Sequence, residues 1–362
     1  TDGTERQNSG YIKKLIEINT EAARFFYSNI KDHPGSVADS YIKGRHIKEG
    51  TVIRFGIGYS PEGWDSLLRH LKEKGYAEKD IEAAGLILKS KKGTYYDRFR
   101  NRIMFPIIDV RNRVIGFGGR LISGEGPKYM NSPETKVYNK STSLYGINIA
   151  KNSKAEKMII VEGYMDCISL HQAGFNNCVA SLGTALTIKQ ARMLKKLVPE
   201  VIIAYDMDQA GRNAALRGLD MIAKLDCAVK VLEIPDGKDP DDFIKRNGST
   251  AFAKLIDRAL PLVEYKAKLL RGKYNINERD GRLKFLNGVA KAIAQVSNAI
   301  EREMYINRIS SDYAISKEAL ETEVLKSTKG TAGVSSDKVN KLKSSLHLEI
   351  GVDMKSFMAM AA

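Results

Sequence analysis

Six acidic side chains follow three short apolar segments of this sequence, two after each segment. They are Glu162, Asp166, Asp206, Asp208, Asp239 and Asp241. The apolar segments, 158–161, 201–205 and 229–234, have the length and composition of buried strands. Like charges that gather at one site repel each other unless a cation offsets them, and carboxylate oxygens are the ligands that Mg²⁺ and Mn²⁺ prefer. The pattern therefore predicts a site for a divalent cation.

The order of the elements explains why these acids should meet. Helical spacing over 165–173 and 212–225 separates the apolar segments, which indicates a mainly parallel sheet with helices on both faces. In such sheets, ligands bind where the strands end. A helix that begins near residue 163 places Glu162 and Asp166 on one face. Alternation at a strand end likewise places Asp206 and Asp208 on one side.

A basic segment precedes this region. Residues 89–140 contain 12 Lys and Arg against 4 Asp and Glu, which gives +8 of the formal +15 of the whole chain. Such a concentration is typical of a track for a polyanion. Divalent cations beside such a track favour phosphodiester chemistry, in which a metal pair activates an attacking oxygen and offsets the charge on the leaving oxygen.

Other features exclude whole classes of protein. No segment approaches the ~18 apolar residues of a membrane span, and the mean hydropathy is −0.31. Residues 1–10 are polar and lack the apolar core of a signal peptide. The three cysteines, Cys167, Cys178 and Cys227, form no CxxC pair, so we expect no structural zinc and no disulfide framework. These features predict a cytoplasmic protein with no membrane partner.

The remaining patterns predict four regions and a fold of the α/β class, α+β overall. Residues 1–150 form a basic, mixed amino-terminal subdomain, mostly helical over 11–88, with a β-hairpin over 102–120 and an irregular loop over 123–148. Residues 151–250 form the sheet domain, in which Thr187 and Gln190 have capping-box spacing. Residues 251–330 form a helical bundle, and 331–362 a linker or an added tail.

Several longer motifs resemble one family. The segments 161–166 (VEGYMD), 181–184 (SLGT), 205–212 (YDMDQAGR) and 236–241 (DGKDPD) together resemble the Toprim core of bacterial replicative DNA primases. Upstream, 96–106 (YDRFRNRIMFP), 116–120 (GFGGR) and 128–135 (KYMNSPET) resemble the amino-terminal subdomain of the same family. The resemblance covers about residues 11–325.

The resemblance implies a Toprim-type sheet and a DNA-directed RNA polymerase. Such an enzyme copies a single-stranded DNA template into short RNA primers from ribonucleoside triphosphates and leaves an RNA–DNA hybrid. It implies that Mg²⁺ or Mn²⁺ is held by Glu162, Asp206, Asp208 and Asp239, and that Asp166 and Asp241 complete the surroundings of the metals or a further metal site. It also implies a ridge for template and nucleotide made of Arg45, Arg120, Lys128, Tyr129, Asn131 and Lys140.

The sequence departs from the family pattern at both ends. It has no Cys/His set for a zinc-binding domain, and too little chain follows residue 330 to form a helicase-binding domain. We therefore expect a monomeric polymerase core, with the replicative helicase bound only through a carboxyl-terminal domain that is absent here. Two alternatives stay open: a metal-dependent Toprim nuclease or topoisomerase, and a nucleic-acid-binding module without catalysis.

Overall fold

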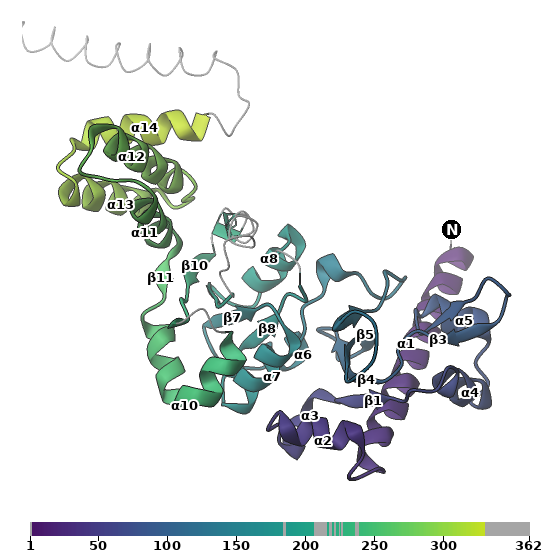
Figure 1. Cartoon of the computed structure of the whole chain (residues 1–362). Coiled ribbons are helices and arrows are strands. Elements are labelled where there is room, and N and C mark those ends of the chain that lie inside the picture. Colours follow the sequence, from purple (N-terminus) through teal and green to yellow (C-terminus); the bar gives the residue numbers. More distant parts are fainter. Residues whose placement is uncertain are drawn as a thin grey trace, which may run out of the picture. The chain divides into compact units, whose positions relative to one another are not determined.

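The computed structural model describes residues 2–183, 186–205, 216, 219–220, 222–223, 225, 227–235 and 239–329. The chain divides into two compact units, Thr1–Tyr265 and Lys266–Ala362 (Figure 1). The predicted boundaries at residues 150, 250 and 330 stay predictions. The tail predicted over 331–362 lies outside the described residues, as does most of the helix predicted over 212–225.

An antiparallel sheet organises the amino-terminal part of the first unit. Its elements are α1 (Asp2–Lys31), α2 (Val37–Gly44), α3 (Glu49–Phe55), β1 (Gly58–Ser60), α4 (Ser66–Glu73), α5 (Glu78–Ala83), β2 (Ile87–Lys89), β3 (Tyr95–Asp97), β4 (Arg102–Ile108), β5 (Val114–Leu121), β6 (Tyr129–Asn131), η1 (Lys140–Thr142) and α6 (Ile147–Ala150). The strand order is β1-β4-β5-β6, and β2 pairs with β3 separately. The predicted hairpin is confirmed as β4 and β5. The loop expected to be irregular contains β6, which pairs with β5.

Helix α1 packs on this sheet through one apolar stripe. Leu15, Ile18, Ala22 and Phe26 recur every three or four residues and are fully buried. The ring of Phe26 meets that of Phe117 on β5 edge to face, with 5.3 Å between centroids. This stripe fixes the position of the strand that carries part of the site.

The second sheet is the predicted, mainly parallel one. Its elements are β7 (Lys157–Val161), α7 (Tyr164–Gln172), β8 (Cys178–Ala180), α8 (Ile188–Lys195), β9 (Glu200–Ile203), β10 (Ala228–Val231), α10 (Pro240–Asp257) and β11 (Leu260–Pro261). The order is β11-β10-β9-β7-β8, with only β11 antiparallel. α7 and α10 pack against each other (Figure 1). The predicted capping box of Thr187 and Gln190 begins α8.

One hydrophobic core joins the two sheets. It includes Phe105 of β4, Ile159 of β7 and Tyr164 of α7. Tyr145, which follows η1, exchanges two main-chain hydrogen bonds with Ala180 of β8, at 2.9 and 3.0 Å. The acidic and basic segments of the sequence therefore belong to one packed unit.

The described part of the second unit, up to residue 329, is helical, as predicted for this region. Within it, α12 (Arg279–Ile293), α13 (Ala299–Asp312) and α14 (Lys317–Lys329) contact one another, and α11 (Leu262–Lys273) leads into it. Buried Phe285, Val289, Ile306, Leu320 and Val324 form its interior. None of the described helices combines the length and apolar character that crossing a membrane requires.

A buried carboxylate holds the start of α4. Asp97 accepts hydrogen bonds from the main-chain N–H groups of Leu67 (2.7 Å) and Leu68 (3.0 Å). Both amides lie in the first turn of the helix, where N–H groups lack partners within the helix. Burial raises the pKa of Asp97 to about 6.

Replacing Asp97 by Ala should destabilise the first unit by about 1–3 kcal/mol, because it leaves these buried amides without acceptors. Asp97→Asn keeps an oxygen acceptor and should lose less. Since folding raises the pKa of Asp97, the stability of the wild type relative to Asp97→Asn should fall as the pH rises from about 4 to 6. Urea unfolding followed by the fluorescence of Trp64, the single tryptophan, measures both effects. Equal midpoints for the wild type and Asp97→Ala would contradict this account.

Candidate catalytic site

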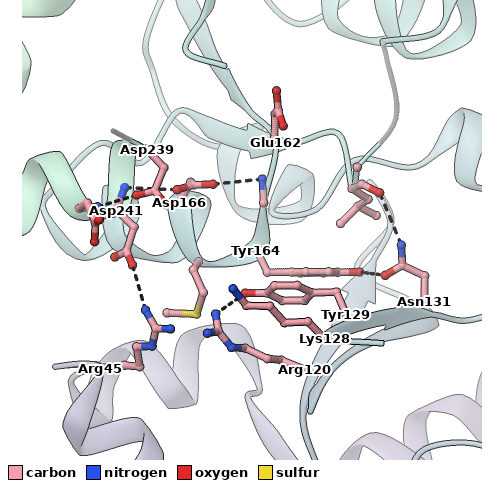
Figure 2. A pocket seen from close by; sticks show the side chains of 15 residues that line it. Arg45, Arg120, Lys128, Tyr129, Asn131, Glu162, Tyr164, Asp166, Asp239 and Asp241 are labelled. Carbon is pink, nitrogen blue, oxygen red and sulfur yellow. Dashed lines mark hydrogen bonds and ion pairs between the residues drawn. The ribbon is translucent and has the colours of Figure 1, made fainter. Parts of the chain in front are cut away.

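A cavity of about 420 Å³ lies where the ends of β7 and β8 face β5 and β6 (Figure 2). It is lined by Arg45, Arg120, Lys128, Tyr129, Asn131, Glu162, Gly163, Tyr164, Met165, Asp166, Leu182, Gly183, Asp239, Asp241 and Asp242. Nine of the twelve predicted site residues are in this set. Asp206 and Asp208 lie outside the described residues. Lys140 does not line the cavity; it begins η1, where its main-chain N–H donates to Glu134.

The acids lie directly after a strand or at the start of a helix, as the pattern predicts. Glu162 directly follows β7, and Asp166 lies in the first turn of α7. Asp239 is the N-cap of α10 and accepts a hydrogen bond from the N–H of Asp242 at 2.7 Å. The carboxylate of Glu162 points away from the other acids in Figure 2.

The carboxylate of Asp166 is held by two main-chain amides. It accepts hydrogen bonds from the N–H groups of Gly163 and Asp241, each at 3.2 Å. Burial, followed by the negative charges of Asp239 and Asp241, raises its pKa to about 7. Burial also raises the pKa of Asp239. A cation in the cavity would favour the ionised form of both groups.

Asp241 has a different environment from its neighbours. Its Oδ2 atom is 2.7 Å from Nζ of Lys245 and 3.7 Å from Nη1 of Arg45, and its Oδ1 atom accepts a hydrogen bond from the hydroxyl of Ser169. The side chain is almost fully buried. Its charge is therefore offset within the protein.

The oxygen atoms of three aspartates indicate which cation this part of the cavity can bind. The carboxylates of Asp239, Asp241 and Asp242 offer oxygens within 4.8 Å of one another. Oxygen donors alone fit Mg²⁺ or Mn²⁺. Because Asp241 is already paired with two cationic side chains, Asp239 is the better ligand of the two.

The opposite side of the cavity is cationic and aromatic. Nη1 of Arg120 donates to the hydroxyl of Tyr129 at 2.6 Å, and its guanidinium lies 5.1 Å from the centroid of that ring. The guanidinium groups of Arg45 and Arg120 lie 5.7 and 5.5 Å from the centroid of the Tyr41 ring. Arg120, Lys128 and Tyr129 lie together beside Tyr164 in Figure 2. This side suits phosphates and bases.

Sequence reasoning missed three features near the site. Tyr164 connects the two sides of the cavity, since its hydroxyl donates to Oδ1 of Asn131 at 2.7 Å. Lys245 lies one helical turn after Asp241 on α10, and this i,i+4 spacing was a usable signal. Gly118 allows the ring of Tyr164 to approach β5; the glycine-rich run 116–119 indicates a close approach of the backbone but not its partner.

A further aromatic site lies on the surface of the amino-terminal part. The side chain of Trp64 is 64% exposed, although tryptophan is usually largely buried. The guanidinium of Arg100 lies 4.1 Å from the centroid of its ring and 5.4 Å from that of Tyr96. Only the fold brings these residues together.

Comparison with known families agrees with this geometry. Residues 25–151 match the N-terminal domain of the DNA primase catalytic core, and residues 159–244 match a Toprim-like family. Residues 263–318 match the DnaB-helicase binding domain of primase. The expectation that a helicase-binding segment is absent is therefore wrong. Apolar spacing located these helices but carries no information about what their exposed faces bind.

Individual relatives give the same result. The chain is 43% identical over 340 residues to a DNA primase of Clostridium acetobutylicum, covering 92% of this chain and 56% of the relative. A DNA primase of Halalkalibacterium halodurans is 35% identical, with 92% and 57% covered. The chain thus spans a little over half the length of these relatives.

Solved structures match over most of the chain. A DNA primase domain from Pseudomonas aeruginosa has a TM-score of 0.77 at 37% identity, and the match covers 86% of this chain and 99% of that one. A DnaG primase catalytic domain bound to single-stranded DNA has a TM-score of 0.78 at 32% identity, with the same coverage. With the acids and the basic track in one cavity, these matches show that the chain belongs to the bacterial DNA primase family.

Proposed function

We propose that this chain is the RNA polymerase core of a bacterial primase, which acts in the cytoplasm and makes short RNA primers on single-stranded DNA. The observation that carries the proposal is that carboxylates and the cations of Arg45, Arg120 and Lys128 line one cavity. Nucleotidyl transfer needs both the acidic and the basic side of the cavity. The acids bind the metal ions that contact the triphosphate, and the basic side chains bind phosphates. A related catalytic domain bound to single-stranded DNA supports the choice of template.

In this reaction the 3′-hydroxyl of the primer attacks the α-phosphate of a ribonucleoside triphosphate, and pyrophosphate leaves. Glu162 and Asp239, together with Asp206 and Asp208, would hold Mg²⁺ or Mn²⁺. The metals would supply Lewis-acid stabilisation of the charge that develops on the transferred phosphate. The carboxylate donor set favours these ions over zinc.

The remaining residues of the cavity bind and orient the substrates. The cations of Arg45, Arg120 and Lys128 offset phosphate charge, so affinity should weaken steeply with salt. Tyr129, held by Arg120, offers a ring on which a base can stack. Asp241 positions Arg45 at the cavity through their ion pair, rather than holding metal itself. Asp166 fixes the start of α10, because it accepts the N–H of Asp241.

We also propose that residues 263–318 contact a DnaB-type replicative helicase and that the chain acts as a monomer. The match to a helicase-binding family supports the first part. Ile300 and Met304 lie one turn apart on α13 and are 74% and 66% exposed. Exposed apolar side chains in such a pair fit a protein interface.

The direct test of the proposed function supplies single-stranded DNA, labelled ribonucleotides and Mn²⁺ or Mg²⁺. The wild type should make RNA, and Asp239→Asn should lose at least about 100-fold of this activity, because it removes a charged ligand. Asn keeps the oxygen that caps α10, so folding and DNA affinity should stay close to those of the wild type. Asp257→Asn, exposed near the other end of α10, is the matched control.

RNA synthesis by Asp239→Asn at the rate of the wild type would contradict the ligand assignment. The same assay separates the alternatives. Metal-dependent cleavage of supercoiled or nicked DNA without RNA products would favour a nuclease or topoisomerase. DNA binding without either product would favour a module without catalysis.

We propose that the template path also includes the surface around Trp64. An exposed indole under a guanidinium combines base stacking with a positive charge, which is the usual chemistry of single-strand binding. Tyr96 and Arg100 also lie within the basic segment 89–140.

Replacing Trp64 by Ala should weaken the binding of single-stranded DNA by about 5- to 100-fold, which corresponds to the loss of one stacked base. Trp64→Phe keeps an aromatic face and should lose less. Fluorescence anisotropy with a labelled oligonucleotide measures both dissociation constants. Exposed Trp64 carries little of the core, so the fold should tolerate both changes, and unchanged affinity in Trp64→Ala would exclude this surface from the path.

A further inference from the structure

The side chain of Tyr164 links the acidic and basic sides of the cavity. It is the first residue of α7, two positions after Glu162, and only 4% of it is exposed. Its ring stacks on Phe105 of β4, with 4.9 Å between centroids and 13° between planes, and lies 6.2 Å from Tyr129. A residue of helix α7 therefore packs among aromatic rings of the strands β4 and β6.

A glycine makes this insertion possible. A Cβ atom at residue 118 would lie 2.2 Å from both Cζ and Oη of Tyr164, which is far closer than a van der Waals contact. Gly118 of β5 is paired in register with Asn131 of β6. The absent side chain at residue 118 therefore leaves the room through which the hydroxyl of Tyr164 reaches Asn131.

The hydrogen bonds of Asn131 fix the orientation of its amide. The carbonyl oxygen of Leu182 can only accept, and it lies 3.5 Å from Nδ2, so that nitrogen must face it. Oδ1 then faces the hydroxyl of Tyr164, which donates at 2.7 Å. An amide nitrogen carries two N–H groups, so one donor of Asn131 remains beyond the bond to Leu182.

Leu182, which accepts the hydrogen bond of Asn131, has an unusual backbone conformation. Leu182 has a φ of +65°, the left-handed region that residues other than glycine rarely adopt. It follows β8 and lines the cavity together with Asn131. The hydrogen bonds from Tyr164 to Asn131 and from Asn131 to Leu182 thus connect α7, β6 and the loop after β8. Figure 2 shows the first two of these residues.

We propose that Tyr164 is a positioning residue for the incoming ribonucleotide: its hydroxyl holds the amide of Asn131 so that the remaining N–H faces the nucleotide. This inference rests on the proposed function and deepens it. An uncharged amide donor suits a sugar hydroxyl or a base edge, whereas the neighbouring Arg120 and Lys128 suit phosphates. Loss of the hydroxyl should therefore affect nucleotide binding more than turnover.

The test is a double-mutant cycle of Tyr164→Phe and Asn131→Ala, read as KM and kcat for ribonucleotides. Tyr164→Phe keeps the ring stacks and should raise KM by about 3- to 10-fold, the equivalent of one neutral hydrogen bond, with kcat nearly unchanged. Asn131→Ala should raise KM at least as much. If Tyr164 acts through Asn131, Tyr164→Phe adds nothing in the Asn131→Ala background.

A matched control comes from the same aromatic group. Among the described residues, the buried hydroxyl of Tyr145 has no hydrogen-bond partner, and its ring lies 4.7 Å from that of Tyr164. Tyr145→Phe also removes one hydroxyl but should leave KM unchanged. An unchanged KM in Tyr164→Phe, or effects of the two cycle variants that simply multiply, would overturn the inference.

Equilibrium binding of a fluorescent ATP analogue in Mn²⁺ repeats the cycle without turnover. A wild type that binds the analogue but makes no RNA overturns the proposed function, and the cycle still decides the role of Tyr164. A wild type that binds no nucleotide overturns the inference about Tyr164 as well.

Discussion

Repulsion among carboxylates that share one sheet edge is the constraint on which the site depends. The negative charge of Asp241 is offset within the protein, because its Oδ2 atom forms ion pairs with Lys245 and Arg45. Asp166 instead accepts main-chain N–H groups, and its pKa rises to about 7. Hydrogen bonds from amides offset less negative charge than a full cation does. A divalent cation beside Asp166 and Asp239 would offset the repulsion that remains between them.

Aromatic rings, and not ion pairs alone, hold the positive side chains of the cavity in place. Arg120 is fixed against Tyr41 and Tyr129, so its guanidinium is positioned before any phosphate arrives. Tyr164 and Gly118 set the contact between the two sheets. Because such contacts are close-packed, a small change at one of them would shift the cations relative to the carboxylates. The geometry of the site is thus a property of the joint core.

The sequence could predict the acids because parallel strands end at a common edge, so Glu162, Asp166 and Asp239 could be placed together before any coordinates. The hairpin followed from two apolar runs around a polar turn. Strand β6 could not be predicted, because three residues are too few to show alternation. The role of Tyr164 depends on Gly118, 46 positions earlier in the chain, and therefore requires the tertiary structure. The helicase-binding match could not follow from spacing, which reports only that helices form.

The central claim is that Glu162 and Asp239 hold the metal, whereas Asp241 pairs with cations of the protein. The most direct measurement is the anomalous diffraction of crystals soaked in Mn²⁺. The account predicts manganese within about 2.2 Å of carboxylate oxygens of Glu162 and Asp239, the usual range for such bonds, while Asp241 stays paired with Lys245 and Arg45. Manganese bound by Asp241, or no manganese in the cavity at saturating concentration, would contradict the account.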